Sequence, residues 1–216
     1  MRETLARIEG TGVRVLDLEI IRIAPDFEVA KFLPFMEVGQ RLGAQNILVA
    51  GDDGDEARLT ANFAALCEAA ARHGLTCDLE FMPWTQVPNV SAARRIVEAA
   101  AHPAGGVLVD ALHFARSAST LDEVRQLPRE RLHYAQICDG LVPGPTTTEG
   151  LIFDARCARL LPGEGGIDLR ALFAALPPDL PVSIEVPHDV RAPAMGYEAW
   201  AKAAFEATKR VLEGQS

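Results

Sequence analysis

Several short apolar segments of this chain end in side chains that can hold a metal ion or move a proton. Asp110 closes the segment GVLVD at 106–110, and His113 and Arg116 follow within the next helical turn. The same pattern recurs at the ends of other apolar segments, with Glu19, Asp52, Glu80, Gln136, Asp139, Glu185 and His188. One acidic residue at such a place is usually a helix N-cap or a surface carboxylate.

Several such residues gathered in one pocket would have different chemistry. Carboxylates in a partly dry pocket repel one another unless protons or a cation compensate their charge. Oxygen-rich ligand sets favour hard divalent ions, so Mn²⁺ or Mg²⁺ is the expected cofactor. In this interpretation Asp110 ends its strand as a metal ligand, and His113 and Arg116 reach a bound substrate.

The apolar segments are predicted to be β-strands that bring these residues together. They alternate with segments of helical periodicity, which is typical of a parallel α/β fold, and lie at 13–23, 46–51, 76–81, 106–112, 132–138 and 181–187. Their continuous apolar character favours a β/α barrel or a doubly wound sheet. The phosphate-binding motifs GxGxxG and GxxxxGKS/T of nucleotide-binding sheets are absent. In a barrel, all strand ends of one polarity meet on one face.

Composition excludes several classes of partner. The chain of 216 residues, 49% of them hydrophobic, fits one globular domain over 1–216. Because it lacks a signal-peptide profile and any apolar run near the roughly 20 residues of a membrane span, we expect a cytoplasmic protein. A net charge of −9 with scattered Lys and Arg argues against nucleic acid and favours a small polar substrate. The acidic segment 51–56 is expected to cap the next helix, and the four cysteines to be free thiols.

Five motifs, in order and spacing, resemble those of the xylose-isomerase-like TIM barrels, the sugar phosphate isomerase/epimerase superfamily: LEFMPW, VDALHFAR, QICDG, RLLPGEGGIDL and SIEVP. The resemblance implies a divalent metal held by Glu80, Asp110, Gln136 and Glu185. It also implies an isomerase or epimerase of a small sugar or polyhydroxylated carbonyl compound that works through an enediolate. Glu80 and Glu185 would exchange protons on opposite faces of that intermediate.

The same resemblance suggests residues that contact the substrate. His113 matches a family position that contacts substrate oxygens, and Arg159 matches a basic residue on the loop over the site. His188 lies on the same side of its strand end as Glu185 and is a further candidate, as are Arg116 and Glu19. Trp84 is expected to pack in the core, with an apolar wall against a sugar ring as the alternative.

Three departures from the family pattern keep other functions open. The usual third ligand is His, whereas this chain has Gln136, a residue familiar in the dehydroshikimate dehydratases. Those lyases carry a His where this chain has Met82, and the epimerases tend to have a Glu where it has Gln86. A dehydroshikimate-type lyase and a catalytically silent barrel are therefore the alternatives to an epimerase.

The chain also lacks sequence for the first two β/α units of an eight-stranded barrel. It begins on a helix-like segment at 2–10 and then enters what aligns with the third strand. We expect an open six-stranded barrel with exposed edges at 13–23 and 181–187, closed by a partner subunit in a homo-oligomer, or a chain shortened relative to the full family member. The connection at 141–166 is predicted to be a lid with its tip at 146–148, or a merely mobile loop.

Overall fold

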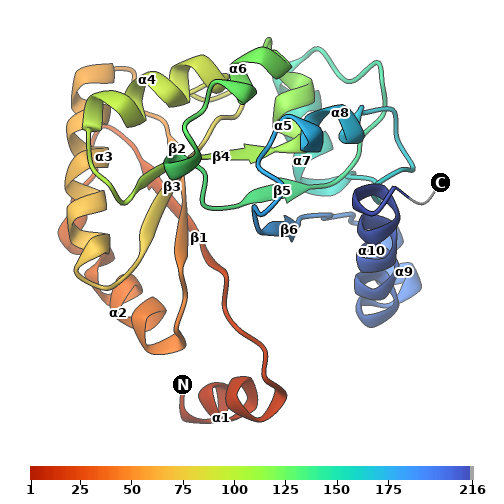
Figure 1. Cartoon of the computed structure of the whole chain (residues 1–216), viewed down its shortest axis with the longest axis horizontal. Helices are drawn as coiled ribbons and strands as arrows, with labels where there is room; N and C mark the ends of the chain where they lie inside the picture. Colours follow the sequence, from red (N-terminus) through yellow and green to blue (C-terminus); the bar gives the residue numbers. More distant parts are fainter. Residues whose placement is uncertain (215–216) are drawn as a thin grey trace.

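Residues 1–214 of the chain are described by a computed structural model (Figure 1). The described residues form one parallel sheet whose strands follow chain order. Its strands are β1 (Asp17–Ile23), β2 (Asn46–Gly51), β3 (Thr76–Glu80), β4 (Gly105–Asp110), β5 (Ala135–Ile137) and β6 (Val182–Ile184). All six predicted strands are confirmed, with shorter bounds at most ends.

Helices follow the strands and cover one face of the sheet (Figure 1). Short 3₁₀ segments stand at Val29–Phe32 and Arg129–Arg131. The helices of the layer are α2 (Leu33–Leu42), α3 (Glu56–Ala71), α4 (Val90–Ala100), α5 (Ala111–Arg116), α6 (Leu121–Arg125), α8 (Leu169–Ala174), α9 (Arg191–Met195) and α10 (Tyr197–Leu212). The acidic segment caps α3 as predicted, because the Asp55 side chain accepts a hydrogen bond from the backbone N–H of Arg58.

The strand side chains alternate between two separate apolar layers. On β2, Ile47 and Val49 belong to the large core under the helices, whereas Leu48 packs with Leu108 and Tyr134 on the opposite face of the sheet. Side chains of a strand point alternately to its two faces, so both faces are covered in this sheet. The second face lines the interior of the half-barrel. The residues at the carboxyl ends of its strands form the site.

The sheet is curved but open. Strands β1 and β6 are its two edges, and no pairing joins them among the described residues. The curvature brings non-adjacent strands together, because the Gln136 side chain on β5 donates a hydrogen bond of 3.3 Å to Glu19 on β1. Helix α1 (Arg2–Thr11) has no buried residue and stands below the sheet at the N-terminus (Figure 1). The structure confirms the predicted six-stranded half-barrel.

The segment 141–166 was predicted to be a loop, and this prediction was wrong for the middle of the segment. Helix α7 (Thr148–Cys157) occupies this part, and Thr147 caps it by accepting a hydrogen bond from the backbone N–H of Gly150. Thr147 is therefore a helix N-cap and not the tip of a lid. Pro143 and Pro145 break helical patterns, and their presence made the whole segment resemble a loop although both lie before the N-cap.

Asp139, another strand-end carboxylate, organises the turn that follows α7. Its buried carboxylate accepts hydrogen bonds of 2.8–3.1 Å from the backbone N–H groups of Gly140, Gly163, Gly165 and Ile167. This explains Asp139 as a structural residue that holds two distant chain segments together.

We therefore expect Asp139→Ala to lower the free energy of unfolding by about 2–3 kcal/mol, because it leaves several N–H groups without their acceptor. Urea denaturation would measure this loss. Asp168→Ala is the matched control, since Asp168 accepts from the single N–H of Ala171 at a helix N-cap and should cost only about 1 kcal/mol. Equal losses in the two variants would contradict this account of Asp139.

Within residues 1–214, no helix is long and apolar enough to cross a membrane. All four cysteines are free, as predicted, and three of them are buried: Cys67, Cys77 and Cys138.

Candidate active site

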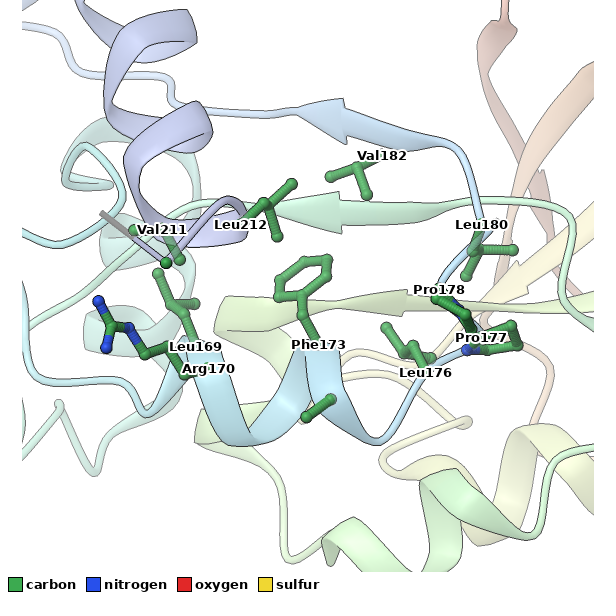
Figure 2. Close-up of a pocket in the computed structure, with 12 residues that line it drawn as sticks. Leu169, Arg170, Phe173, Leu176, Pro177, Pro178, Leu180, Val182, Val211 and Leu212 are labelled. Atoms are coloured by element: carbon green, nitrogen blue, oxygen red, sulfur yellow. The ribbon is translucent and has the colours of Figure 1, made fainter. Parts of the chain in front are cut away.

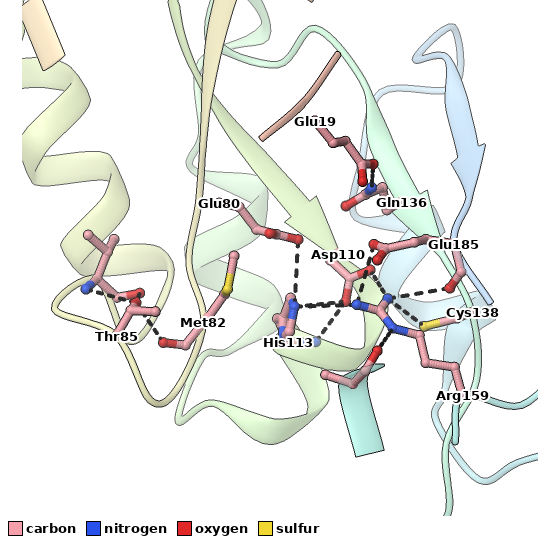
Figure 3. Close-up of polar contacts among 12 residues, drawn as sticks. Glu19, Glu80, Met82, Thr85, Asp110, His113, Gln136, Cys138, Arg159 and Glu185 are labelled. Carbon is pink, nitrogen blue, oxygen red and sulfur yellow. Dashed lines mark hydrogen bonds and ion pairs between the residues drawn. The ribbon is translucent and has the colours of Figure 1, made fainter. Parts of the chain in front are cut away.

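The carboxyl ends of the strands surround a cavity of about 310 Å³. Glu80 is the last residue of β3, and Asp110 is the last residue of β4, next to Gln136 of β5 in register. His113 stands in α5, directly after β4. Because parallel strands present their carboxyl ends on one edge, these residues converge as the sequence predicts (Figure 3).

Glu80, Asp110 and His113 form the tightest group of candidate metal ligands. One ligand atom from each lies within 4.8 Å of the others, and all three side chains are buried. His113 Nε2 is 3.6 Å from Glu80 Oε1 and 4.0 Å from Asp110 Oδ1. Asp110 also caps α5, since its Oδ1 accepts a hydrogen bond of 2.9 Å from the backbone N–H of His113. Asp110 is therefore both the N-cap of α5 and a member of the candidate ligand group.

Arg159 is the cation of this site (Figure 3). Its side chain is only 3% exposed, and Nη1 lies 2.6 Å from Asp110 Oδ2 while Nη2 lies 3.3 Å from Glu185 Oε2. Nε donates a hydrogen bond of 2.8 Å to the carbonyl oxygen of Ala155, which fixes the direction of the guanidinium. Arg159 thus compensates the buried carboxylate of Asp110 and the half-buried carboxylate of Glu185.

Several buried polar atoms at the site have no hydrogen-bond partner in the described structure: Glu80 Oε1, His113 Nδ1 and Gln136 Oε1. A buried acceptor without a donor is costly, and two of these atoms are oxygens that bind divalent cations well. The donor set of carboxylates, a carboxamide and an imidazole therefore fits a divalent ion.

The electrostatics of the pocket raise the pKa values of Glu80 and Glu185 and lower that of Asp110. Burial raises the pKa of Glu80 well above its usual value, and the nearby Asp110 charge adds to this. Burial also raises the pKa of Glu185 to about 7, against a lowering effect of Arg159. Burial opposes ionisation of Asp110 as well, but the charge of Arg159 and hydrogen bonds hold the pKa of Asp110 below its usual range. Burial lowers the pKa of His113 to about 4, so its imidazole is neutral at pH 7.

The raised pKa of Glu185 predicts a pH-dependent stability difference. Between pH 4.5 and about 7 the unfolded chain releases this proton while the folded protein keeps it, so ionisation costs stability as the pH rises. In EDTA, the free energy of unfolding of Glu185→Gln, relative to that of wild type, should therefore rise by on the order of 2 kcal/mol as the pH is raised from 5 to 8. His113 contributes with the opposite sign, but equally in both proteins. A pH-independent difference in urea denaturation would contradict the raised pKa.

Two predicted substrate contacts do not line this cavity. Arg116 forms an ion pair of 2.7 Å with Asp154 of α7 and donates to the carbonyl oxygen of Leu141, so it holds the segment before α7. A Cβ at Gly144 would overlap the Arg116 guanidinium, which explains the glycine there. His188 packs against Trp200 and accepts from backbone N–H groups at the start of α9. Both residues have structural partners instead.

Three further residues line the cavity: Trp84, for which a wall against a sugar ring was the alternative expectation, and two arginines that the sequence did not indicate. Trp84 contacts the imidazole of His113 edge-on, with ring centroids 5.1 Å apart, so it forms an apolar wall as well as packing below α7. Arg22 and Arg156 line the cavity too. Arg156 belongs to α7, the helix that sequence patterns did not indicate.

A second cavity of about 440 Å³ lies in the helix layer between α8 and α10 (Figure 2). Apart from Arg170 its lining is largely apolar, with Phe173, Leu176, Val182 and Leu212, and none of the strand-end carboxylates reaches it. The group of candidate metal ligands lies at the first cavity.

Comparison with known proteins agrees with this architecture. The family model described as "Xylose isomerase-like TIM barrel" matches residues 22–211. A segment of 143 residues is 27% identical to a 3-dehydroshikimate dehydratase of Pseudomonas putida; the match covers 63% of this chain and 22% of that protein. The chain therefore matches about a fifth of the length of this curated relative.

Solved structures show the same fold. The IolI protein, whose crystal structure contains a bound zinc atom, is 20% identical with a TM-score of 0.79, over 99% of this chain and 82% of that one. The 3-keto-D-glucoside 4-epimerase YcjR of E. coli is 19% identical with a TM-score of 0.70, over 94% of this chain and 84% of that one. The chain belongs to the xylose isomerase-like TIM barrel family.

Proposed function

We propose that this protein is a divalent-metal-dependent isomerase or epimerase of a small polyhydroxylated carbonyl compound. The observation that carries the proposal is the buried group of Glu80, Asp110 and His113 at the carboxyl ends of the strands, with Glu185 and Gln136 beside it. The membership of the chain in a family with isomerase and epimerase relatives supports the same reaction class.

In this proposal Glu80, Asp110, Gln136 and Glu185 hold the ion, and His113 is a further candidate ligand. When bound, a divalent ion supplies positive charge beside the carbonyl oxygen of the substrate, which acidifies the neighbouring C–H bond. Mn²⁺ or Mg²⁺ suits the carboxylate and carboxamide oxygens. Trp84 and Met82 form apolar walls that exclude water from the reacting carbon.

The two glutamates have properties suited to proton exchange. In this proposal Glu185 accepts a proton from carbon and Glu80 delivers one, because both carboxyl groups line the same cavity, where burial raises their pKa values in the metal-free protein. In an epimerase, one carboxylate removes the proton from one face and the other returns a proton to the opposite face. His113, neutral at pH 7, donates or accepts one hydrogen bond with the substrate oxygens, and Arg159 keeps Asp110 ionised.

A lyase of the dehydroshikimate dehydratase type is the second candidate, and two observations favour it: the sequence match to such an enzyme and the presence of Gln136. The first step is the same removal of a proton from the carbon beside a carbonyl. In the lyase, a neighbouring hydroxyl then leaves as water after taking up a proton, so a double bond remains. An epimerase returns the proton to carbon instead.

Product analysis separates these reactions. The Mn²⁺-loaded protein would be incubated in D₂O with a panel of ketoses and, separately, with 3-dehydroshikimate, and products followed by NMR. Deuterium at the carbon beside the carbonyl, with inversion and no loss of water, supports the epimerase. Loss of water from 3-dehydroshikimate supports the lyase, and absence of both reactions and of deuterium exchange in metal-loaded protein supports a silent barrel.

The free edges of β1 and β6 support a further part of the proposal, namely a homo-oligomer in which another subunit covers them. Sedimentation velocity measures this directly. A monomer at micromolar concentration would contradict it.

A further inference from the structure

Gln136 is the one carboxamide in a group of candidate ligands that are otherwise carboxylates and an imidazole. Its side chain is fully buried on β5. The two ends of a carboxamide differ, because the nitrogen donates hydrogen bonds whereas the oxygen accepts them and can bind a cation. The value of Gln136 as a metal ligand therefore depends on which end faces the other candidate ligands.

The carboxylate of Glu19 fixes the direction of this carboxamide. Gln136 Nε2 donates a hydrogen bond of 3.3 Å to Glu19 Oε1, across the interior of the half-barrel from β5 to β1 (Figure 3). Gln136 Oε1 is left without a hydrogen-bond partner in the described structure, as is Glu80 Oε1 at the same end of the sheet. The reverse orientation would bring the amide oxygen against a carboxylate, which has no proton to donate to it.

An irregularity in β1 accompanies this position of Glu19. Leu18 and Ile21 pair with positions 47 and 49 of β2, so β1 has one residue more than β2 over the same span. Both side chains pack in the core under the helices, although residues three positions apart point to opposite faces of a regular strand. A bulge of this kind re-aims side chains and is common beside active sites. Glu19 lies within the bulge, and its side chain lines the cavity.

We propose that Glu19 is a positioning residue, whose carboxylate holds the NH₂ group of Gln136 and thereby presents the Gln136 oxygen to the divalent ion. The role rests on the proposed function, because the ion belongs to that proposal. A ligating imidazole is commonly held in the same way, by an acceptor for its second nitrogen, and loss of such a partner weakens metal binding by about 10- to 100-fold. In this chain a carboxamide replaces the imidazole, and Glu19 supplies the acceptor.

A double-mutant cycle in Mn²⁺ affinity tests the role of Glu19. It compares wild type, Glu19→Ala, Gln136→Ala and the double variant by calorimetry, or by the EPR signal of free Mn²⁺ where binding is weak. Glu19→Ala should weaken binding at least about tenfold when Gln136 is present. In the Gln136→Ala background the same change should alter affinity by less than about threefold, because no carboxamide remains to be oriented. Equal losses in both backgrounds overturn the inference, since Glu19 would then act as a ligand itself or through its charge alone.

Glu28→Ala is the matched control for the loss of a carboxylate. Glu28 follows β1 and pairs with Lys31 at the surface, outside the cavity. Its removal makes the same change in net charge and should leave the Mn²⁺ affinity within about twofold of wild type. Glu19 is itself exposed on an edge strand, so its truncation should not disturb folding. A loss in Glu28→Ala as large as that in Glu19→Ala overturns the inference, because net charge would then explain both.

NMR of the metal-free protein tests the contact between the two side chains without any ion. The side-chain ¹H–¹⁵N cross-peaks of Gln136 are assigned by their absence in Gln136→Ala. In Glu19→Ala these cross-peaks should move upfield and exchange faster with water, because the hydrogen bond to a carboxylate is lost. They should stay in place in Glu28→Ala. Cross-peaks that do not respond to Glu19→Ala overturn the inference.

The two measurements distinguish failure of this role from failure of the proposed function. If wild type binds metal but the cycle shows equal losses, or the cross-peaks do not respond, the role of Glu19 is wrong and the proposed function stands. If wild type binds no metal, the proposed function fails, and the cross-peaks alone decide whether Glu19 orients Gln136.

Discussion

Replacing Arg159 with methionine is expected to lower the free energy of unfolding of the metal-free protein by about 3–5 kcal/mol, the usual cost of leaving a buried charge without its partner. Asp110 is fully buried, and Arg159 is its ion-pair partner at 2.6 Å. Methionine keeps the apolar stem of the arginine side chain, so the loss reports mainly the charge and the hydrogen bonds of the guanidinium.

Urea denaturation in EDTA measures this effect. Arg191→Met is the matched control, since Arg191 pairs with Glu164 at the surface and its removal should cost about 0–1 kcal/mol. Millimolar Mn²⁺ should recover part of the loss in Arg159→Met, because a bound cation replaces the missing positive charge and binding stabilises the folded state. A loss no larger than that of the control would contradict the role of Arg159 as the buried counter-charge.

Replacing Glu185 with glutamine is expected to reduce turnover of the substrate by about 10³-fold, since general acid–base catalysis contributes on the order of 10²–10⁴. The carboxamide has nearly the same shape but cannot accept a proton from carbon. The part of the pH dependence of kcat that comes from the ionisation of Glu185 should disappear in the variant. Steady-state kinetics from pH 5 to pH 9 measure both effects.

Metal content distinguishes the two ways in which Glu185→Gln could act. If the variant retains metal and loses turnover, Glu185 transfers the proton. If the variant also loses metal, Glu185 is one of the metal ligands. Glu164→Gln is the control, because Glu164 lies outside the cavity in a surface ion pair with Arg191. Turnover within a few fold of wild type in Glu185→Gln would contradict both roles.

The sequence predicted the sheet and the centre of the site because both depend on local patterns. Strand β4 is an apolar run that ends in Asp110, and β3 is one that ends in Glu80. In a parallel fold, the place of a residue along its strand is enough to put these carboxylates on one face. Neither the direction of a side chain nor a contact across the fold was needed for that prediction.

Other parts depended on contacts between distant segments, which no local pattern reveals. Arg116 follows Asp110 by one helical turn, but its guanidinium is drawn away to Asp154 of α7. Arg159 was expected over the site, but its burial between Asp110 and Glu185 arises from tertiary packing. The prolines before helix α7 made its sequence resemble a loop, so the helix was not predicted. The position of Arg156 in the cavity wall was therefore not predicted either.

The proposed function requires that the strand-end carboxylates hold one divalent ion. Calorimetric titration of metal-free wild type and Glu80→Gln with Mn²⁺ and Mg²⁺ measures this binding, with circular dichroism to verify folding. Glu80 Oε1 has no hydrogen-bond partner, so the isosteric change removes ligand charge with little effect on packing. We predict one-to-one binding to wild type and affinity at least about tenfold weaker in the variant. Absence of binding to folded wild type, or equal binding to both proteins, would contradict the claim.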